Sequence, residues 1–194
     1  MITVLDIISG LCWSIVYITA IFLGVKHHTW FIPKIAICQN FAWEFWIVLY
    51  RMRMGTANDV SFVVQLVWVL LDIGVALTWL VFDQPSAQQR LKNAALFLLI
   101  ATAMYLLIVE MRQWEYVSFI INVIMSILFV RRVYTDSSRK TSITIAFTKM
   151  IGTLAATIIH GLILFDPFTL WLGGICLLLD SYYLSLLFKK ARGN

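Results

Sequence analysis

Charged residues are scarce in this chain: they make up 13% of its 194 residues, against about a quarter in a typical soluble domain. Hydrophobic residues make up 61%, and the mean hydropathy is +0.88. Apolar residues are distributed along the whole length, so no segment looks like a detachable water-soluble domain. The composition excludes a soluble globular protein and predicts a single transmembrane domain over residues 1–194.

Cysteine is equally sparse. The three cysteines are Cys12, Cys38 and Cys176, and all three fall within apolar runs. They show neither CxxC nor Cys/His spacing, so the sequence predicts no disulfide framework and no zinc site.

Hydrophobic runs long enough to cross a bilayer core of about 30 Å occur seven times. They cover residues 4–25, 30–50, 61–82, 94–109, 115–130, 143–164 and 168–188. The fourth and fifth runs are the shortest, and Glu110, Arg112 and Glu115 between and beside them suit a water-facing turn. We therefore predict an all-α, polytopic bundle of seven transmembrane helices.

Lysine and arginine are distributed unevenly between the two sides of this predicted bundle. One side receives Lys26, Lys34, Arg90, Lys92, Arg131, Arg132, Arg139, Lys140, Lys189, Lys190 and Arg192, and the other receives Arg51, Arg53 and Arg112. Because basic loops stay in the cytoplasm, we expect the N-terminus outside and the C-terminus in the cytoplasm. The net charge of +5 then belongs to cytoplasmic loops, and we expect no nucleic-acid partner.

Carboxyl groups inside the predicted spans are the most informative polar residues. Glu44 and Asp180 lie in the second and seventh spans, and Asp72 lies in the third. An ionisable group at bilayer depth costs a few kcal/mol or more, so it indicates a functional site by default. Asn40, Trp43 and Glu44 are spaced i, i+3 and i+4, which predicts one helix face directed into the protein.

Other polar residues in the spans have a structural interpretation. Hydroxyl and amide side chains commonly join transmembrane helices by hydrogen bonds, and this interpretation is favoured for Ser118, Asn122, Ser126, Thr153 and Thr157. Lys149 and His160 lie nearer the predicted helix ends, where we expect contacts with the membrane interface.

Two motifs resemble those of a known family. The segments CQNFAWEF, with Asn40, Trp43 and Glu44, and LLLDSYYLSLL, with Asp180 and Tyr183, are similar to the two acidic motifs of the small integral-membrane terpene cyclases. That family comprises fungal meroterpenoid and indole-diterpene cyclases and their bacterial relatives. The resemblance implies that a polyprenyl or prenylated aromatic substrate is cyclised after protonation of a terminal epoxide or olefin.

The residues are suited to that chemistry. A buried carboxyl group favours its neutral form, so Glu44 and Asp180 are the candidate catalytic residues, one of them acting as general acid. Candidate substrate-binding residues are Asn40, Trp43, Trp68, Asp72, Tyr105 and Tyr183, whose aromatic members could stabilise carbocations. A hydrophobic prenylated substrate would enter from the bilayer among membrane lipids. The chain contains neither DxDD nor DDxxD, so we expect no metal and no cofactor.

Two alternatives remain open at this stage. A proton-coupled transporter of small solutes could use the same intramembrane acids, and a structural membrane protein could pair its acids with Lys149 or with amides. In each case we expect a multi-pass protein, of the endoplasmic reticulum if fungal and of the plasma membrane if bacterial. The sequence leaves the oligomeric state open.

Overall fold

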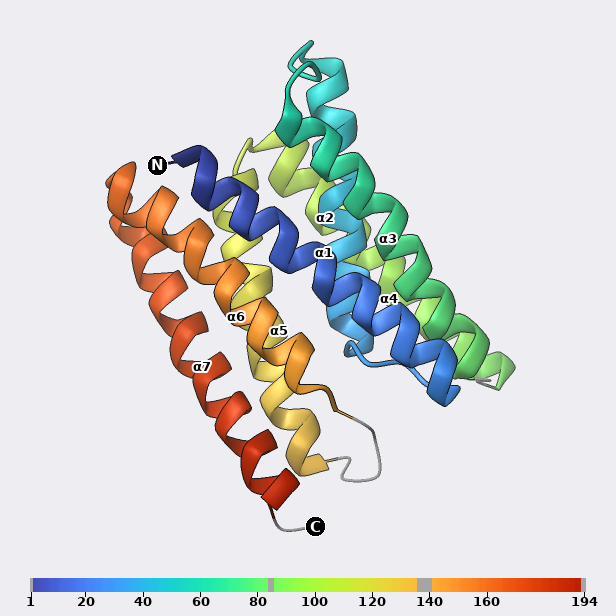
Figure 1. Ribbon diagram of the computed structural model, residues 1–194. Coiled ribbons are helices and arrows are strands. Elements are labelled where there is room, and N and C mark those ends of the chain that lie inside the picture. Colours follow the sequence, from blue (N-terminus) through green and yellow to red (C-terminus); the bar gives the residue numbers. More distant parts are fainter. Residues whose placement is uncertain (1, 84–85, 136–140, 193–194) are drawn as a thin grey trace.

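The computed structural model describes residues 2–83, 86–135 and 141–192, and these residues form a bundle of seven α-helices (Figure 1). The helices are α1 (Ile2–His27), α2 (Lys34–Arg53), α3 (Val60–Phe82), α4 (Ala87–Tyr105), α5 (Trp114–Thr135), α6 (Ile143–Thr157) and α7 (Pro167–Arg192). No strand occurs within these ranges, which confirms the all-α prediction. Arg139 and Lys140, counted above on the basic side, lie outside the described residues.

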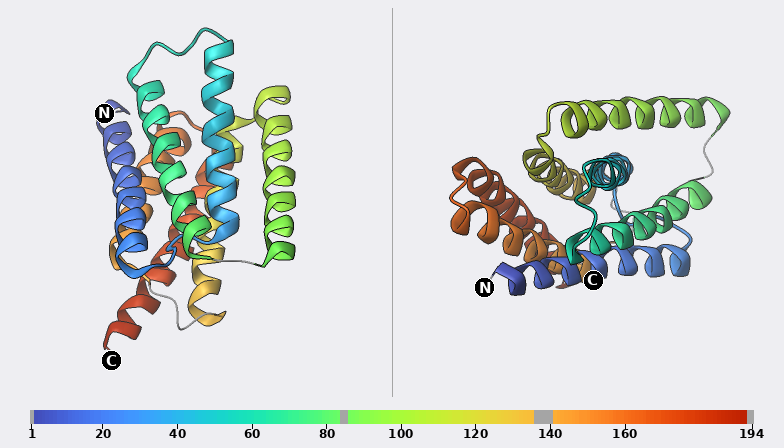
Figure 2. Two further views of the ribbon diagram at one scale, coloured as in Figure 1. Left: turned by 90° about the vertical axis from the view of Figure 1, so that its right-hand side faces the viewer. Right: turned by 90° about the horizontal axis from the view of Figure 1, so that it is seen from above.

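Six of the helices have the length and hydropathy of a membrane span, and α2 is the exception. Its 20 residues include Lys34, Glu44, Arg51 and Arg53. Helix α2 packs against α3, α4 and α5 and lies in the middle of the bundle when it is viewed along its length (Figure 2). Because most of α2 faces protein, it needs less hydrophobic surface than its lipid-facing neighbours. The first and last helices end the chain at opposite ends of the bundle (Figures 1 and 2), as expected when seven helices alternate in direction.

Helix starts are fixed by side-chain caps at the loop ends. Asp59, Ser86 and Ser142 each precede a helix and accept a hydrogen bond from a backbone N–H three residues later, at 2.8, 3.3 and 3.3 Å. Such caps satisfy donors that the first helical turn leaves unpaired. The Arg51 guanidinium donates to Asp59 at 2.7 Å, and this contact lowers the pKa of that exposed carboxyl below its usual range.

Two helices end in a short π-helical turn. Helix α4 continues into η1 (Leu106–Glu110), and α6 continues into η2 (Ile158–Ile163). Each turn is followed within two residues by a left-handed residue, Arg112 with φ 57° and Phe165 with φ 56°. At the end of each turn, a backbone N–H donates to the carbonyl six residues earlier, for example Gln113 N–H to the Leu107 carbonyl at 2.9 Å. We therefore interpret η1 and η2 as helix C-terminal closures of the kind that a left-handed residue allows.

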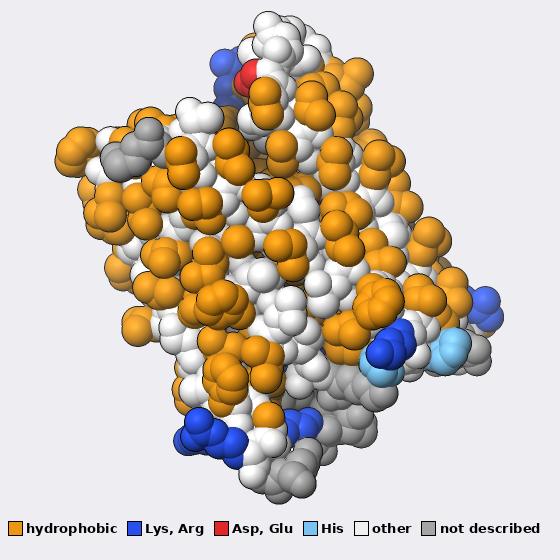
Figure 3. All heavy atoms as spheres, viewed as in Figure 1, with side chains coloured by type: hydrophobic (Ala, Val, Ile, Leu, Met, Phe, Trp, Pro, Cys, Tyr) orange, Lys and Arg blue, Asp and Glu red, His pale blue; other side chains and the backbone are white. Residues whose placement is uncertain are grey.

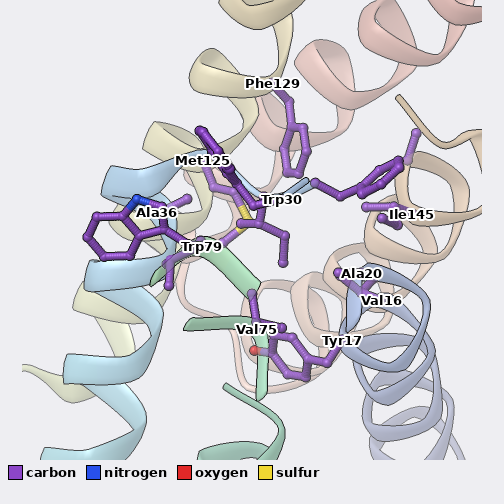
Figure 4. Close-up of a cluster of buried hydrophobic side chains, with 14 of the residues drawn as sticks. Val16, Tyr17, Ala20, Trp30, Ala36, Val75, Trp79, Met125, Phe129 and Ile145 are labelled. Atoms are coloured by element: carbon purple, nitrogen blue, oxygen red, sulfur yellow. The ribbon is translucent and has the colours of Figure 1, made fainter. Parts of the chain in front are cut away.

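A main apolar core joins α1, α2, α3, α5, α6 and α7, and Figure 4 shows part of it. The loop between α1 and α2 contributes Trp30, Phe31 and Ile32, which are all buried. The Arg132 guanidinium of α5 donates to the carbonyls of Phe31 and Trp30, both at 2.5 Å. Because buried carbonyls need donors, this arginine fixes the loop against the end of the bundle.

The outer surface matches a protein surrounded by lipid. The face drawn in Figure 3 is mostly hydrophobic, and its Lys and Arg side chains gather toward the ends of the bundle. At one end these include Lys26 in the last turn of α1 and Lys189, Lys190 and Arg192 in the last turn of α7. Charge at the ends and apolar residues between them are the pattern of transmembrane helices. Which end faces the cytoplasm remains a prediction.

Helices α6 and α7 pack closely at Gly173. A Cβ atom added at Gly173 would overlap the side chain of Thr157, whereas a Cβ atom at Gly174 would meet no atom within 4 Å. We expect Gly173→Ala to lower the free energy of unfolding by about 1–3 kcal/mol through overpacking. Gly174→Ala is the matched control, because it gains the same helix propensity without the overlap. Thermal unfolding of the two purified variants tests this, and equal melting temperatures would contradict the expectation.

Candidate functional site

The candidate site begins at Glu44, in the middle of α2. The Glu44 side chain is buried, with 2% of its residue surface exposed. The hydroxyl of Tyr17, on α1, donates to Glu44 Oε1 at 2.6 Å. Asn40, one turn before Glu44, donates from Nδ2 to the Tyr17 hydroxyl oxygen at 2.5 Å. These contacts form a chain of donors from Asn40 through Tyr17 to the Glu44 carboxyl group.

Asp72 of α3 joins the same cluster. Its residue surface is 1% exposed, and its carboxyl group is near enough to that of Glu44 for the two to interact electrostatically. Helix α3 packs on both α1 and α2, and Figure 4 shows the Tyr17 side chain directed toward Val75, one turn beyond Asp72. One oxygen of each acid, Glu44 Oε2 and Asp72 Oδ2, is buried without a hydrogen-bond donor. We call Tyr17, Asn40, Glu44 and Asp72 the acid cluster.

Aromatic rings border the acid cluster. The Tyr17 ring lies 6.0 Å from Trp13 and 6.5 Å from Trp68 between centroids, the latter in an edge-to-face arrangement. Trp68 Nε1 donates to Ser14 Oγ at 3.2 Å, which fixes the orientation of its indole. The sequence singled out Trp68 but not Trp13 or Tyr17. The spacing of Trp13 and Tyr17 along α1, i and i+4, was the signal that could have identified them.

Asp180 belongs to a second buried group, formed by α5, α6 and α7. Lys149 Nζ donates to Asp180 Oδ1 at 2.9 Å, to Asp180 Oδ2 at 2.7 Å and to Ser126 Oγ at 2.7 Å. Lys149 and Asp180 are each 1% exposed. The expectation that Lys149 contacts the membrane interface is therefore wrong, because an internal carboxylate holds its ammonium group inside the bundle. Ser126 joins helices by a hydrogen bond, as predicted.

Trp13 connects the two groups. Its ring packs beside Tyr17, and a Cβ atom added at Gly152 of α6 would come within 3.0 Å of Trp13 Cδ1. Gly152 lies three residues after Lys149, so it occupies the neighbouring turn on the same side of α6. Trp13 of α1 therefore contacts both Tyr17 on its own helix and the turn of α6 next to Lys149.

Three further candidate residues occupy different surroundings. Trp43 Nε1 donates to the Trp114 carbonyl at 3.1 Å, and its ring packs in a second apolar cluster on α2, α4 and α5. The Tyr105 hydroxyl donates to Glu110 Oε1 at 2.6 Å in an exposed contact. Tyr183 is buried one turn after Asp180, with its ring 5.2 Å from Phe129. The structure thus brings Asn40, Trp68 and Asp72 to Glu44, and Tyr183 to the neighbourhood of Asp180.

The described residues contain neither a disulfide bond nor a cluster of metal-ligating side chains. Cys12, Cys38 and Cys176 are free thiols. No group of three or more His, Cys, Asp or Glu side chains in the described ranges is arranged to hold a metal ion.

Comparison with known proteins adds an independent finding. The family model of Pyr4-like transmembrane terpene cyclases matches residues 1–192. The Pyr4-family terpene cyclase mfmH of Annulohypoxylon moriforme is 35% identical over 74 residues, which cover 38% of this chain and 29% of that protein. Terpene cyclase pyr4 of Aspergillus fumigatus is 32% identical over 74 residues, which cover 38% of this chain and 30% of that protein.

The matched segments thus span less than a third of either relative, and no solved structure matches the chain. The family match is much longer, because it extends over nearly the whole sequence and includes every element of both buried groups. The chain therefore belongs to the family of Pyr4-like transmembrane terpene cyclases.

Proposed function

We propose that this protein is a membrane-embedded terpene cyclase that works without a metal ion. In this proposal, a polyprenyl or prenylated aromatic substrate is protonated at a terminal epoxide or olefin and then cyclises. The family of the chain supports a cyclase. The observation that carries the proposed mechanism is a buried carboxyl group, Glu44, whose partners Tyr17 and Asp72 bring no positive charge to it.

Glu44 is the proposed proton donor. Without a counter-ion in an apolar interior, a carboxyl group is more stable as the neutral acid than as the anion. Glu44 Oε1 accepts from Tyr17, while Oε2 has no donor against it and is the natural position of the acidic hydrogen. A positioned general acid contributes typically about 10²–10⁴-fold to a rate.

The surrounding rings suit the positive charge that protonation creates. When the Glu44 O–H bond breaks, its proton forms an O–H bond on an epoxide, whose C–O bond then opens, or a C–H bond on an olefin, whose π electrons supply the bonding pair. Ring closure then moves the positive charge along the chain. Tyr17 contacts the acid directly, and Trp13 and Trp68 pack beside the Tyr17 ring. A cation over such a ring gains about 0.5–2 kcal/mol. The last cation releases a proton to a base, so the substrate and the product have the same mass.

Asp180 has a different proposed role. Both of its carboxylate oxygens accept from Lys149, so its charge is neutralised by an ammonium group and the carboxylate has no proton to donate. We therefore propose Asp180 as a positioning residue that holds α6 and α7 in place beside Trp13. The sequence left open which of Glu44 and Asp180 donates the proton, and in this proposal the donor is Glu44.

The proposed substrate arrives from the bilayer. The outer surfaces of the helices are apolar (Figure 3), and a prenyl chain partitions into the same hydrocarbon layer. A membrane interior also keeps water from a carbocation. Residence in the endoplasmic reticulum of a fungus, or in the plasma membrane of a bacterium, belongs to this proposal.

The test is conversion of a defined substrate panel. Membranes containing the protein are incubated with prenylated aromatic compounds, each in plain and terminally epoxidised form, and the extracts are analysed by chromatography with mass spectrometry. We expect a new product of unchanged mass and altered retention that membranes without the protein do not produce. Folded protein that converts no member of the panel would contradict the proposal.

A further inference from the structure

We propose that α5, α6 and α7 enclose a binding site for internal water, formed by Asn122 of α5 and Thr153 of α6. The site lies one helical turn from the buried pair of Lys149 and Asp180, in the direction of His160. This inference goes beyond the proposed function and does not depend on it, because it concerns how a buried ion pair is solvated inside the bundle.

Unpaired polar atoms are the first basis for this inference. Thr153 is 3% exposed, and its hydroxyl oxygen is buried with no hydrogen-bond partner among the described residues. Asn122 Oδ1 and His160 Nδ1 are buried atoms that likewise have no partner there. Such groups are rare in folded proteins and need an explanation. An internal water molecule provides one, because buried waters typically make about three hydrogen bonds to polar groups that would otherwise be unpaired.

The contact between Lys149 and Ser126 places two of these atoms at one level of the bundle. Helices α5 and α6 are consecutive and run in opposite directions (Figure 1). Lys149 Nζ of α6 donates to Ser126 Oγ of α5 at 2.7 Å. Asn122 lies one turn before Ser126, and Thr153 lies one turn after Lys149. Both side chains therefore lie on the same side of that contact, each on the helix face that makes it.

A ring contact extends the same junction toward the end of the bundle. The His160 ring of η2 lies 6.2 Å from the Phe119 ring of α5 between centroids, farther along both elements in the same direction. The backbone N–H of Asp166, in the loop before α7, donates to the His160 carbonyl at 3.2 Å. The unpaired atoms therefore extend from the ion pair toward this loop.

Helix α7 completes the site with a small residue. It packs on both α5 and α6. Asp180 and Gly173 of α7 contact α6 one turn on either side of Thr153. Cys176 lies between these two positions and is 0% exposed, so it occupies the level of Thr153. Short side chains meet at this level, whereas the long side chain of Lys149 spans the neighbouring one. Short polar side chains in a buried junction are the surroundings in which proteins hold internal water.

Water at this position stabilises the ion pair. Taking an ammonium group and a carboxylate out of water is costly even when the two groups contact each other. A bound water has a dipole that can turn toward the charges of Lys149 and Asp180, which reduces this cost. The sequence predicted that Asn122 and Thr153 join helices by hydrogen bonds, and in this inference the water molecule makes the connection.

Oxidation by hydroxyl radicals tests the site without any substitution. A short X-ray pulse produces these radicals from water, and they react with side chains close to the water molecule that formed them. Cys176 and Cys38 are matched probes, because they are buried thiols that are 0% and 1% exposed. Cys38 belongs to the main apolar core, and Cys176 lies at the proposed site. In the purified protein, mass spectrometry should show that Cys176 is oxidised several times faster than Cys38.

Equal oxidation rates of the two thiols would overturn the inference. The double variant Asn122→Leu/Thr153→Val tests the position of the water, because it removes both proposed ligands. In this variant, Cys176 should be oxidised as slowly as Cys38, whose own rate should stay unchanged. If Cys176 keeps its wild-type oxidation rate in the folded double variant, these two residues do not hold the water and the inference is wrong.

Thermal unfolding of Thr153→Val is a second test, in which the sign of the shift is decisive. If the Thr153 hydroxyl binds water, valine removes a hydrogen bond, and the melting temperature should fall by roughly 2–4 °C. If the hydroxyl has no partner at all, valine relieves the cost of burying it and the melting temperature rises.

Thr144→Val is the matched control, because it makes the same change on α6 at an exposed position. It should leave the melting temperature unchanged. A melting temperature of Thr153→Val at or above that of the wild type, or a fall no larger than that of the control, would overturn the inference. Neither experiment measures cyclisation, so a failure of the proposed function would be distinguishable from a failure of the water site.

Discussion

Lys149→Met should lower the free energy of unfolding by about 3–5 kcal/mol, the usual cost of removing one partner from a buried ion pair. The variant leaves the Asp180 carboxylate at the centre of the bundle without the ammonium group that now contacts both of its oxygens. Methionine is close to lysine in length and fills the same space. A lower free energy of unfolding would therefore come from the unpaired charge of Asp180 rather than from a change in side-chain volume. Thermal unfolding in detergent, together with the yield of monodisperse protein, measures the effect.

The double variant Lys149→Met/Asp180→Leu is the matched control. Replacing a whole buried ion pair by apolar residues of similar volume is often neutral or stabilising, so the double variant should unfold near the wild-type temperature. Lys149→Met unfolding at that temperature would mean that the pair is not needed for folding. Asp180→Asn should also reduce the amount of folded protein, because neutralising Asp180 leaves the buried ammonium group of Lys149 without its carboxylate.

The sequence predicted the helices well because hydrophobic length is a local property. All seven helices were expected from runs of apolar residues and the charged turns between them, and the caps at Asp59 and Ser142 begin α3 and α6 next to the predicted starts. Helix α2 was found through the same pattern, although its hydropathy is lower than that of the other six. Of its charged residues, only Glu44 is buried, and the sequence alone did not show that Tyr17 of α1 contacts it.

The candidate site was predicted in part, and the omissions share a physical cause. Glu44, Asp72 and Asp180 were identified because a carboxyl group in an apolar run is conspicuous in a single sequence. Lys149 was assigned to the interface because long basic side chains usually reach the membrane surface, and its partner lies 31 residues away on another helix. Tyr17 was not identified because a tyrosine in an apolar helix is common, and its hydrogen bond to Glu44 joins two different helices.

Helical spacing alone also grouped residues that the structure separates. Asn40, Trp43 and Glu44 share a predicted face, yet the Trp43 indole contacts the Trp114 carbonyl at the start of α5 while Asn40 contacts Tyr17. Positions i+3 and i+4 differ by about 100° around a helix of 3.6 residues per turn. A central helix such as α2 has neighbours on several sides, so adjacent positions within one predicted stripe can face different helices.

Glu44→Gln should abolish detectable cyclisation, with a loss of at least about 10²–10⁴-fold in rate, the usual contribution of a general acid. Glutamine keeps the length and shape of glutamate, and its amide oxygen can still accept from Tyr17, so we expect the fold to survive. What glutamine lacks is a proton acidic enough to transfer to an epoxide or olefin. Product formation by chromatography with mass spectrometry, normalised to the amount of folded protein, gives the comparison.

Glu44→Asp and Tyr17→Phe separate the chemistry from the packing. Aspartate retains the acid but draws it back by one methylene group, so Glu44→Asp should keep a small activity that Glu44→Gln lacks. Tyr17→Phe keeps the Glu44 acid and removes one hydrogen-bond donor to the Glu44 anion. Its cyclisation activity should therefore fall less than that of Glu44→Gln. If Glu44→Gln membranes form product at the wild-type rate, Glu44 does not donate the proton.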